Sequence, residues 1–422
     1  MTDVEIRPLT PDDDMDAQVD LGQRAFGVMS PAQRANWTHV AAIRIGQGAF
    51  LGAFVAGRPA GAALFHDMRQ WWGGRPMPSA GVASVKVAPE HRGKGIGRLL
   101  MTALLDRIAE RGYPVSSLYP ATVPLYRSLG WELAGGRYMA AVPARSLRTL
   151  LAPDPASGAG AARGLPDIRR AGPADAAAVN EVIARSHESA RDSGPLTWDL
   201  GPHARWLARE DMYAYLTDDG FAAYRWANDN EDLFVERVHA ATPAALRALW
   251  QVIASHSSTA ETVRVRIAPA DPLWWLTHER DLTGTSRRMW MLRVVDAPAA
   301  IAARGFPPGV ALTIPLIIRD TNRLTNHGRW TLTVSEGTGT LIPNEPGFLP
   351  STTVSARTGH ASPADSERAA PLTLGARGLA ALYAGTPLAP LRLAGLASGG
   401  TPEADAAIDA GFAATAYMVD DF

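Results

Sequence analysis

The feature that most constrains the fold is a glycine-rich turn between a strand and a helix, in "ASVKVAPEHRGKGIGRLLMTALL" at residues 83–105. Ile96, Leu100 and Leu104 recur at helical spacing, and three glycines and three cations surround the start of this helix. A helix N-terminus presents free N–H groups and the positive end of a dipole, and glycines let a ligand approach the backbone closely. The turn therefore predicts a binding site for an anion with several phosphates.

Two common nucleotide motifs do not fit this turn. The P-loop needs Gly-Lys followed by Ser or Thr, whereas Lys94 is followed by Gly95. The dinucleotide fingerprint is G-x-G-x-x-G, whereas the glycines here are at 93, 95 and 97. A pyrophosphate held mainly by backbone N–H groups remains the better interpretation.

The chain has 422 residues, more than one ordinary core accommodates. The stretch 151–167 is rich in Ala, Gly and Pro and predicts a linker, and "FPPGVA" at 306–311 predicts a second joint. We therefore expect three domains, at 1–150, 165–300 and 305–422.

Composition excludes several classes of protein. There is no cysteine, so disulfides, thiolate metal sites and cysteine nucleophiles are excluded. A formal net charge of −1 gives no reason to expect nucleic acid or an anionic membrane as a partner. The N-terminal stretch is acidic, unlike a secretory signal, and the longest apolar run, "VALTIPLII" at 310–318, is far shorter than the roughly 18 residues of a spanning helix. We expect a cytoplasmic protein.

The first two domains show an internal repeat. "IRPLTPDD" at 6–13 and "IRRAGPAD" at 168–175 place Ile, Arg, Pro and Asp at matching offsets, and each predicts a strand followed by a helix start. "SVKVAPEHRGKG" at 84–95 resembles "RVRIAPADPLWW" at 264–275, which has no glycine. We therefore expect a duplicated fold whose second copy has lost its cofactor site.

The coarse pattern of the chain predicts a mixed α/β fold. Strands over 50–72 and 75–89 flank the turn-forming pair Gly73-Gly74, and a short helix at 123–133 leads into another strand. The third domain alternates the strands "ALTIPLII", "RWTLTV" and "GTLIPN" and ends with helices at 378–385 and 403–413.

The turn resembles the acetyl-CoA site of the GNAT N-acetyltransferases, whose motif Q/R-x-x-G-x-G/A is matched by Arg92, Gly95 and Gly97. "LYRSLGW" at 125–131 resembles a second hallmark of that family, a Tyr before Leu-Gly-aromatic. The whole chain is similar to the Eis (enhanced intracellular survival) family. The resemblance implies tandem GNAT folds, the N-terminal one active and the central one degenerate, and a C-terminal sterol-carrier-protein-like α/β domain.

The resemblance also assigns roles. Tyr126 matches the general acid, and the carboxylate of Phe422 matches the general base. The resemblance implies acetyl-CoA as co-substrate, contacted by Val85, Lys86, Val87, Arg92, Gly93, Lys94, Gly95, Ile96, Gly97, Arg98, Ala121 and Thr122.

Elementary chemistry is consistent with the acid and leaves the base open. A phenol with a pKa of about 10 can donate to a leaving thiolate with a pKa of about 8.5. Tyr119 and Tyr113 are competing phenols. An α-carboxylate with a pKa of about 3.5 is a weak base, although burial raises such values, and it can also act through water or only position the amine.

A few polar and aromatic residues are candidates for the acceptor site. Asp421 could attract a cationic amine, Trp37 could offer a ring face, and His66 lies on a strand that could reach the acceptor. The pair Trp71-Trp72 is as readily explained by packing of the hairpin. The ten histidines lack metal-ligand spacing, so no metal is expected.

These observations predict an enzyme that moves an acetyl group from acetyl-CoA to a primary amine. The resemblance implies aminoglycosides or similar polyamines as acceptors and a homo-oligomer, a hexamer. The alternative is a carrier of apolar ligands in which the CoA site is regulatory or vestigial.

Overall fold

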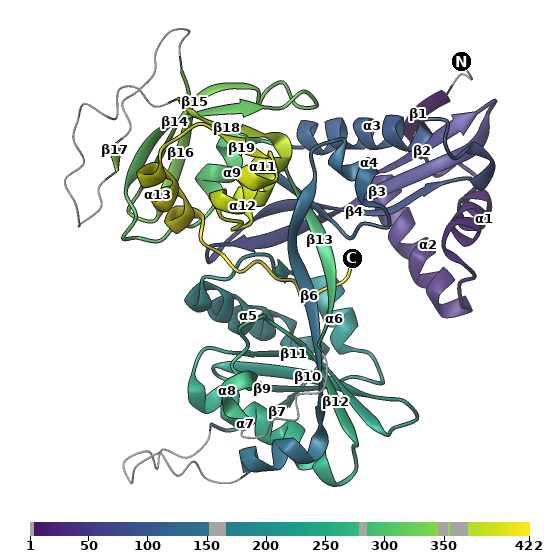
Figure 1. Ribbon diagram of the computed structural model, residues 1–422. Coiled ribbons are helices and arrows are strands. Elements are labelled where there is room, and N and C mark those ends of the chain that lie inside the picture. The colour runs from purple at the N-terminus through teal and green to yellow at the C-terminus, as the bar shows by residue number, and fades with distance from the viewer. Residues whose placement is uncertain (1–3, 152–165, 278–284, 345–352, 355–369) are drawn as a thin grey trace.

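The computed structural model describes residues 4–151, 166–277, 285–344, 353–354 and 370–422 (Figure 1). The linker predicted over 151–167 lies almost wholly outside the described residues.

The first domain is a twisted sheet with helices on both faces. Its strands follow the order β1-β2-β3-β4-β5, antiparallel up to β4 and parallel between β4 and β5. The strands are β1 (Val4–Pro8), β2 (Phe50–Val55), β3 (Arg58–Trp72), β4 (Arg75–Val87) and β5 (Val115–Leu118). The helices are α1 (Met15–Phe26), α2 (Pro31–Gly46), η1 (Pro89–His91), α3 (Ile96–Glu110) and α4 (Val123–Arg127).

Local sequence explains these boundaries. Asp14 caps α1 by accepting from two backbone N–H groups, and Ser30 forms a capping box at α2. Gly73 and Gly74 have φ of 60° and 81°, so the predicted turn between β3 and β4 is confirmed. Trp72 of the same hairpin is fully buried, so its role is packing.

The central domain repeats this plan. Its strands follow β7-β9-β10-β11-β12, again antiparallel until a final parallel pair. The strands are β7 (Arg169–Ala171), β9 (Tyr213–Thr217), β10 (Gly220–Ala227), β11 (Asp232–Ala240) and β12 (Thr262–Ile267). The helices are η3 (Pro173–Asp175), α5 (Ala176–Ala190), α6 (Leu200–Leu207), α7 (Pro243–Ala254), η4 (Ser255–Ser258) and α8 (Leu273–Leu276).

Atomic detail supports the predicted repeat. Arg7 Nη2 lies 2.7 Å from Asp13 Oδ1, and Arg169 Nη2 lies 2.7 Å from Asp175 Oδ1. In each copy the aspartate also accepts a backbone N–H three residues upstream, at 2.8 Å. The same ion pair thus ties the first strand to the following helical turn twice.

One part of the predicted repeat is wrong. The sequence pattern relates the segment 264–275 to the strand and turn at 84–95. In the structure its strand, β12, is the fifth strand of the central domain and corresponds to β5. The counterpart of β4 is β11, which leads into α7 as β4 leads into α3. The error arose because a short Val-rich strand ending in Ala-Pro occurs at two different places in the topology.

Two long strands join these domains into one thirteen-stranded sheet. Strand β13 (Thr285–Val294) lies between β5 and β6 (Glu132–Pro143), and β6 also pairs with β12. Figure 1 shows β6 and β13 running side by side from the first domain into the central one. The short strand β8 (Leu196–Thr197) pairs with β3, and η2 (Ala144–Leu151) follows β6.

The third domain carries its own sheet, in the order β16-β15-β14-β18-β19, with β17 paired to β14. Its strands are β14 (Leu312–Arg319), β15 (Gly328–Ser335), β16 (Thr338–Pro343), β17 (Thr353–Val354), β18 (Leu372–Gly375) and β19 (Ala397–Ser398). Its helices are α9 (Ala297–Ala303), α11 (Ala376–Tyr383), α12 (Leu388–Leu393) and α13 (Pro402–Phe412). The predicted strands and helices of this third are confirmed. Phe306, in the predicted joint, is fully buried and packs edge-on against Phe412.

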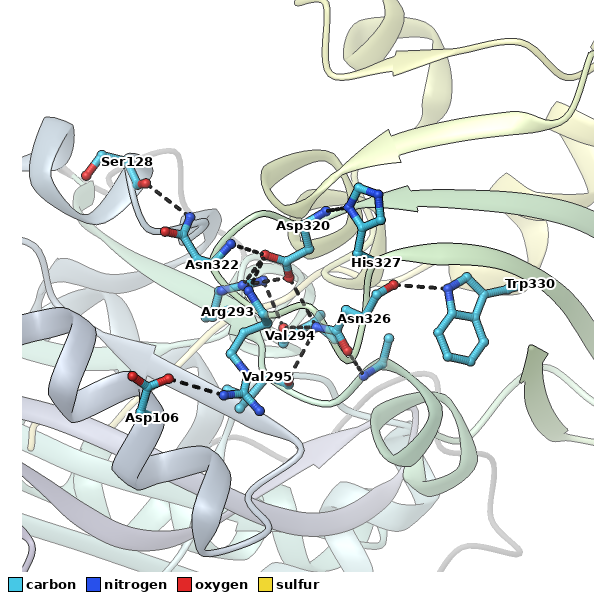
Figure 2. A network of polar contacts seen from close by, with 12 residues as sticks. Asp106, Ser128, Arg293, Val294, Val295, Asp320, Asn322, Asn326, His327 and Trp330 are labelled. Carbon is cyan, nitrogen blue, oxygen red and sulfur yellow. Dashed lines mark hydrogen bonds and ion pairs between the residues drawn. The ribbon is translucent and has the colours of Figure 1, made fainter. Parts of the chain in front are cut away.

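A buried ion pair fixes the third domain to the shared sheet. Arg293 of β13 contacts Asp320, at the end of β14, at 2.6 Å, and neither side chain is exposed (Figure 2). Asn322 donates to the carbonyl of Ser128, directly after α4, at 3.3 Å, and Arg323 pairs with Asp106 of α3. The third domain therefore contacts α3 and the end of α4, the two helices that carry predicted site residues.

Candidate active site

The glycine-rich turn leaves the start of α3 open. Gly95 is the N-cap residue with φ 83°, Gly93 has φ 76°, and no side chain caps the helix. A Cβ atom placed on either glycine would meet nothing within 4 Å, so the space above the turn is free. Ile96 is buried and anchors the helix, which leaves its backbone facing the turn. The turn thus has the conformation and the room that a backbone-bound anion needs.

The charges around the turn also suit an anion. Arg92, Lys94 and Arg98 are exposed, and none forms an ion pair with any residue that the structure describes. Arg92 Nε donates to the carbonyl of Val87 at 3.3 Å, which holds this guanidinium beside the end of β4. These residues fit a pyrophosphate, with main-chain donors at its centre and mobile cations around it.

Strand β4 has an open edge just before the turn. Its parallel pairing with β5 ends at Val82 and Leu118, and beyond that point β4 pairs only with β3. A register shift lies in this part of the β3–β4 pairing, where Ser84 has φ 52°. Within the described chain, no strand pairs with this edge of β4 beyond Val82, so an extended ligand could pair there.

Helix α4 places Tyr126 close to this edge. A Cβ at Gly97 would lie 3.6 Å from both Leu125 Cδ2 and Val87 Cγ2, so α4, β4 and the start of α3 meet. Tyr126 is 4% exposed, and its hydroxyl makes no hydrogen bond to the described residues. Burial raises the pKa of Tyr126 to about 12. Ala121 and Thr122 are exposed at the start of α4, where the Thr122 side chain makes no capping bond.

A cavity of about 1240 Å³ lies between α1–α2, the β3–β4 hairpin and the β8–α6 segment. It brings together four predicted residues from distant parts of the chain: Trp37, His66, Lys86 and Phe422. Tyr126 and Asp421 do not line it.

Phe422 reaches the cavity because packing and hydrogen bonds hold the C-terminal tail in place. Its ring packs against Tyr119, 5.5 Å between centroids, and a Cβ at Gly81 would lie 2.8 Å from its Cδ2 atom. Tyr119 donates to the carbonyl of Asp420 at 2.7 Å, which gives this competing phenol a structural role. The Asp420 carboxylate accepts from Trp198 at 3.0 Å and pairs with Arg237 of β11.

Asp421 does not occupy the predicted position. Its carboxylate forms ion pairs with Arg137 and Arg266 and lies outside the cavity lining. The side-chain carboxylates of the cavity wall are instead Asp67 and Asp199, which the sequence did not single out. Asp67 directly follows His66 and could have been considered, whereas Asp199 is more than a hundred residues away and no pattern connects them.

Each of the other two predicted acceptor-site residues, His66 and Trp37, contacts a cation of the chain. His66 Nδ1 accepts from Arg44 Nε at 3.2 Å, and burial together with this positive charge lowers the pKa of His66 to about 4. His66 is therefore neutral at neutral pH. Lys86 Nζ lies 4.7 Å from the ring centroid of Trp37, so the chain's own ammonium already uses a face of the ring that we expected to bind the substrate.

Comparison with known proteins identifies the domain families of this chain. Three domain families match successive parts of the chain: a GNAT acetyltransferase domain at 5–134, a second GNAT acetyltransferase domain at 195–294 and a sterol carrier protein domain at 297–418. A crystal structure of a GCN5-related N-acetyltransferase from Kribbella flavida is 40% identical with a TM-score of 0.87, covering 100% of this chain and 99% of that chain.

Two further relatives refine the class. N-acetyltransferase Eis of Mycobacterium tuberculosis is 29% identical over 68% of this chain and 71% of that protein. The crystal structure of Eis1 from Mycobacterium abscessus is 25% identical with a TM-score of 0.72, covering 99% of this chain and 100% of that chain. Fold and site therefore define a GCN5-related N-acetyltransferase. Within that class the chain is similar to the Eis N-acetyltransferases, the family that the sequence predicted.

The described residues include neither a membrane-spanning helix nor a metal-binding cluster. No helix among them has both the length and the apolar character that crossing a membrane demands. Nor does that part of the chain gather three or more His, Asp or Glu side chains in a way that could hold a metal ion.

Proposed function

We propose that this enzyme transfers the acetyl group of acetyl-CoA to a primary amine in the cavity next to β4. The observation that carries the proposal is the opening between β4 and β5, which has the anion-binding turn at one end and the cavity wall along the same strand. A thioester donor bound along β4 would reach the cavity where Phe422 and His66 lie.

On the donor side, each predicted contact has a physical basis. The N–H groups of residues 93–97 would hold the pyrophosphate, because no side chain caps this helix start. Arg92, Lys94 and Arg98 would neutralise its charge. The edge of β4 at Val85–Val87 would align the pantetheine amides, and Ala121–Thr122 would lie beside the thioester.

Tyr126 would act as the general acid. Burial holds the pKa of Tyr126 at about 12, so the phenol is fully protonated at neutral pH and can donate to the sulfur as the C–S bond breaks. Its hydroxyl has no partner in the described chain and is therefore available to the leaving group.

The Phe422 carboxylate would act as the base. The acceptor ammonium gives up one proton, its nitrogen forms the bond to the acetyl carbon, and the C–S bond breaks. The nitrogen then loses a second proton while sulfur receives one. The products are an N-acetyl amine, the free thiol and one proton.

The finer expectations from the resemblance belong to this proposal: aminoglycosides or polyamines as acceptors, a hexamer and a cytoplasmic location. Light scattering of the purified protein tests the assembly.

Thiol release from acetyl-CoA, followed colorimetrically with a panel of primary amines, tests the activity. We expect amine-dependent release, with the N-acetyl product seen by mass spectrometry. Coenzyme A binding without release for any amine would contradict the proposal and support the alternative of a carrier with a vestigial CoA site.

A further inference from the structure

The cavity contains a buried ammonium group that the proposed chemistry does not use. The side chain of Lys86 is directed away from the donor edge, lines the cavity and is only 3% exposed. Its Nζ donates to the carbonyl of Gln18 at 2.7 Å and lies over the Trp37 ring. No carboxylate of the described residues lies within ion-pair distance, so two of its three N–H groups have no acceptor there.

Neither aspartate of the cavity wall pairs with Lys86. Asp67 and Asp199 act on Arg44, which shares the wall with them. Arg209 is neutralised by two hydrogen bonds to Asp211, at 2.9 and 2.7 Å. Lys86 has no such neighbour, and burial alone lowers its pKa to about 8. The ammonium therefore remains mostly charged at neutral pH without a counter-ion.

A buried charge is unfavourable unless it is paired and hydrogen-bonded. A ligand that brings an anion to Lys86 would supply both missing acceptors and the counter-charge. A polycation at the same place would meet like charge in a region of low dielectric, where repulsion is strong. The wall near Lys86 also includes the apolar side chains of Phe26, Val28 and Met29, which suit a hydrocarbon segment.

We infer that the preferred acceptor is a primary amine that also carries a carboxylate, with Lys86 as the specificity-determining residue that binds this carboxylate. The inference rests on the proposed acetyl transfer, and it replaces the aminoglycoside or polyamine acceptors that the resemblance implies with amino carboxylates. It places the reacting amine towards Phe422 and the carboxylate at the α1–α2 end of the cavity, with the apolar part of the acceptor between them.

Three six-carbon amines that differ only at the far end test this inference: 6-aminohexanoate, hexylamine and 1,6-diaminohexane. We expect kcat/KM to be highest for 6-aminohexanoate, by about tenfold over hexylamine, because a charge-assisted hydrogen bond is worth about a factor of ten or more. Diaminohexane and kanamycin should be poorer still.

The variant Lys86→Met keeps the length and the apolar stem and removes the charge. We expect it to abolish the preference for 6-aminohexanoate over hexylamine. Arg209→Met is the matched control, since it removes a cation from the same wall that is already paired, and the preference should stay within about twofold of wild type. A melting temperature for Lys86→Met at or above that of wild type would show that it folds, as expected when an unpaired buried charge is removed.

Calorimetry of amine binding in the presence of coenzyme A, which carries no acetyl group, distinguishes the acetyl-transfer proposal from the inference about Lys86. If no amine releases thiol but 6-aminohexanoate binds wild type at least tenfold more tightly than Lys86→Met, the acetyl transfer fails and the anion site stands. If thiol is released equally well with diaminohexane and 6-aminohexanoate, or Lys86→Met keeps the wild-type preference, the inference about Lys86 is overturned and the acetyl transfer stands.

Discussion

Helices α3 and α7 occupy the same place in the two GNAT domains, each following the strand that forms the parallel pair. Helix α3 begins after residues 88–95 with Gly95 in a left-handed conformation and no side-chain cap. Helix α7 begins directly after β11, with Thr242 accepting from Ala245 N at 3.3 Å and Pro243, which has no N–H, in its first turn. One helix start is left open to water or to an external anion, and the other is capped by its own residues.

The strand openings differ in the same way. Past its pairing with β5, the edge of β4 pairs with no other strand of the described chain. Past its pairing with β12, β11 uses Arg237 to bind Asp420, and Arg266 of β12 donates to the carbonyl of Val419 at 3.0 Å. The central domain thus fills its opening with the C-terminal tail. A shared topology supplies the opening, and a few local residues decide whether it binds a ligand or the chain itself.

The largest expected effect is on kcat, and it distinguishes Tyr126 of the first domain from Tyr224 of the central domain. Tyr126→Phe should lower kcat by about 1,000-fold, as loss of a general acid does, while leaving the affinity for coenzyme A unchanged. Tyr224→Phe in the central domain is the control, because that hydroxyl bonds His256 Nε2 at 2.7 Å, within its own domain. Similar kcat values for both variants would show that Tyr126 is not the acid.

The pH dependence of the wild-type rate gives a second readout of Tyr126. Because its pKa is raised to about 12, the phenol stays protonated well above the ordinary value of about 10. The acid therefore contributes no alkaline loss of kcat below about pH 11. A loss with a midpoint near 10 that is absent in Tyr126→Phe would contradict the buried position.

A carboxylate at position 95 should make the start of α3 unfavourable for an external anion. Gly95→Asp places a carboxylate at the turn, and aspartate tolerates the left-handed conformation better than most residues. We expect affinity for coenzyme A, measured by calorimetry, to fall by about 100-fold, which corresponds to the loss of one or two charge-assisted hydrogen bonds. Gly95→Asn has the same shape without the charge and should lose much less. Equal losses would assign the effect to shape.

Adding one alanine after Phe422 moves the carboxylate away from the cavity wall. We expect kcat/KM for the amine to fall by about tenfold or more, while coenzyme A still binds. Phe422→Leu, which keeps the carboxylate in place, is the control and should be less impaired. Full activity of the extended chain would exclude the carboxylate from the chemistry.

The smallest effect concerns the ion pair that both copies share. Asp13→Asn should lower the unfolding free energy by about 1 kcal/mol or less, since the pair is partly exposed. The hydrogen bond from Arg7 lowers the pKa of Asp13, so its contribution is present above about pH 4 and is lost as the pH falls. Melting curves of both proteins should therefore converge in acid, and a constant difference would contradict the assignment.

Much of this arrangement could be predicted because glycine patterns and strand periodicity act locally. The turn at 92–98, the Gly73-Gly74 hairpin and the strands of the third domain all follow from short-range constraints. The direction of Lys86 could not, because the irregular pairing at Ser84 changes which side chains share a face. Asp199 enters the cavity through tertiary packing alone, and the ion pairs of Asp421 arise from arginines in two domains.

The position of β13 has a consequence for how this gene can change. Residues 285–294 belong to the second acetyltransferase match, yet they fill the gap between β5 and β6, the strands flanking Tyr126 in the chain. Deleting the central domain would therefore remove both neighbours of β6 and one neighbour of β5, and these unpaired strand edges would invite aggregation. The central copy therefore supports the sheet of the first domain, and changes in its own opening would also release the tail that carries Phe422.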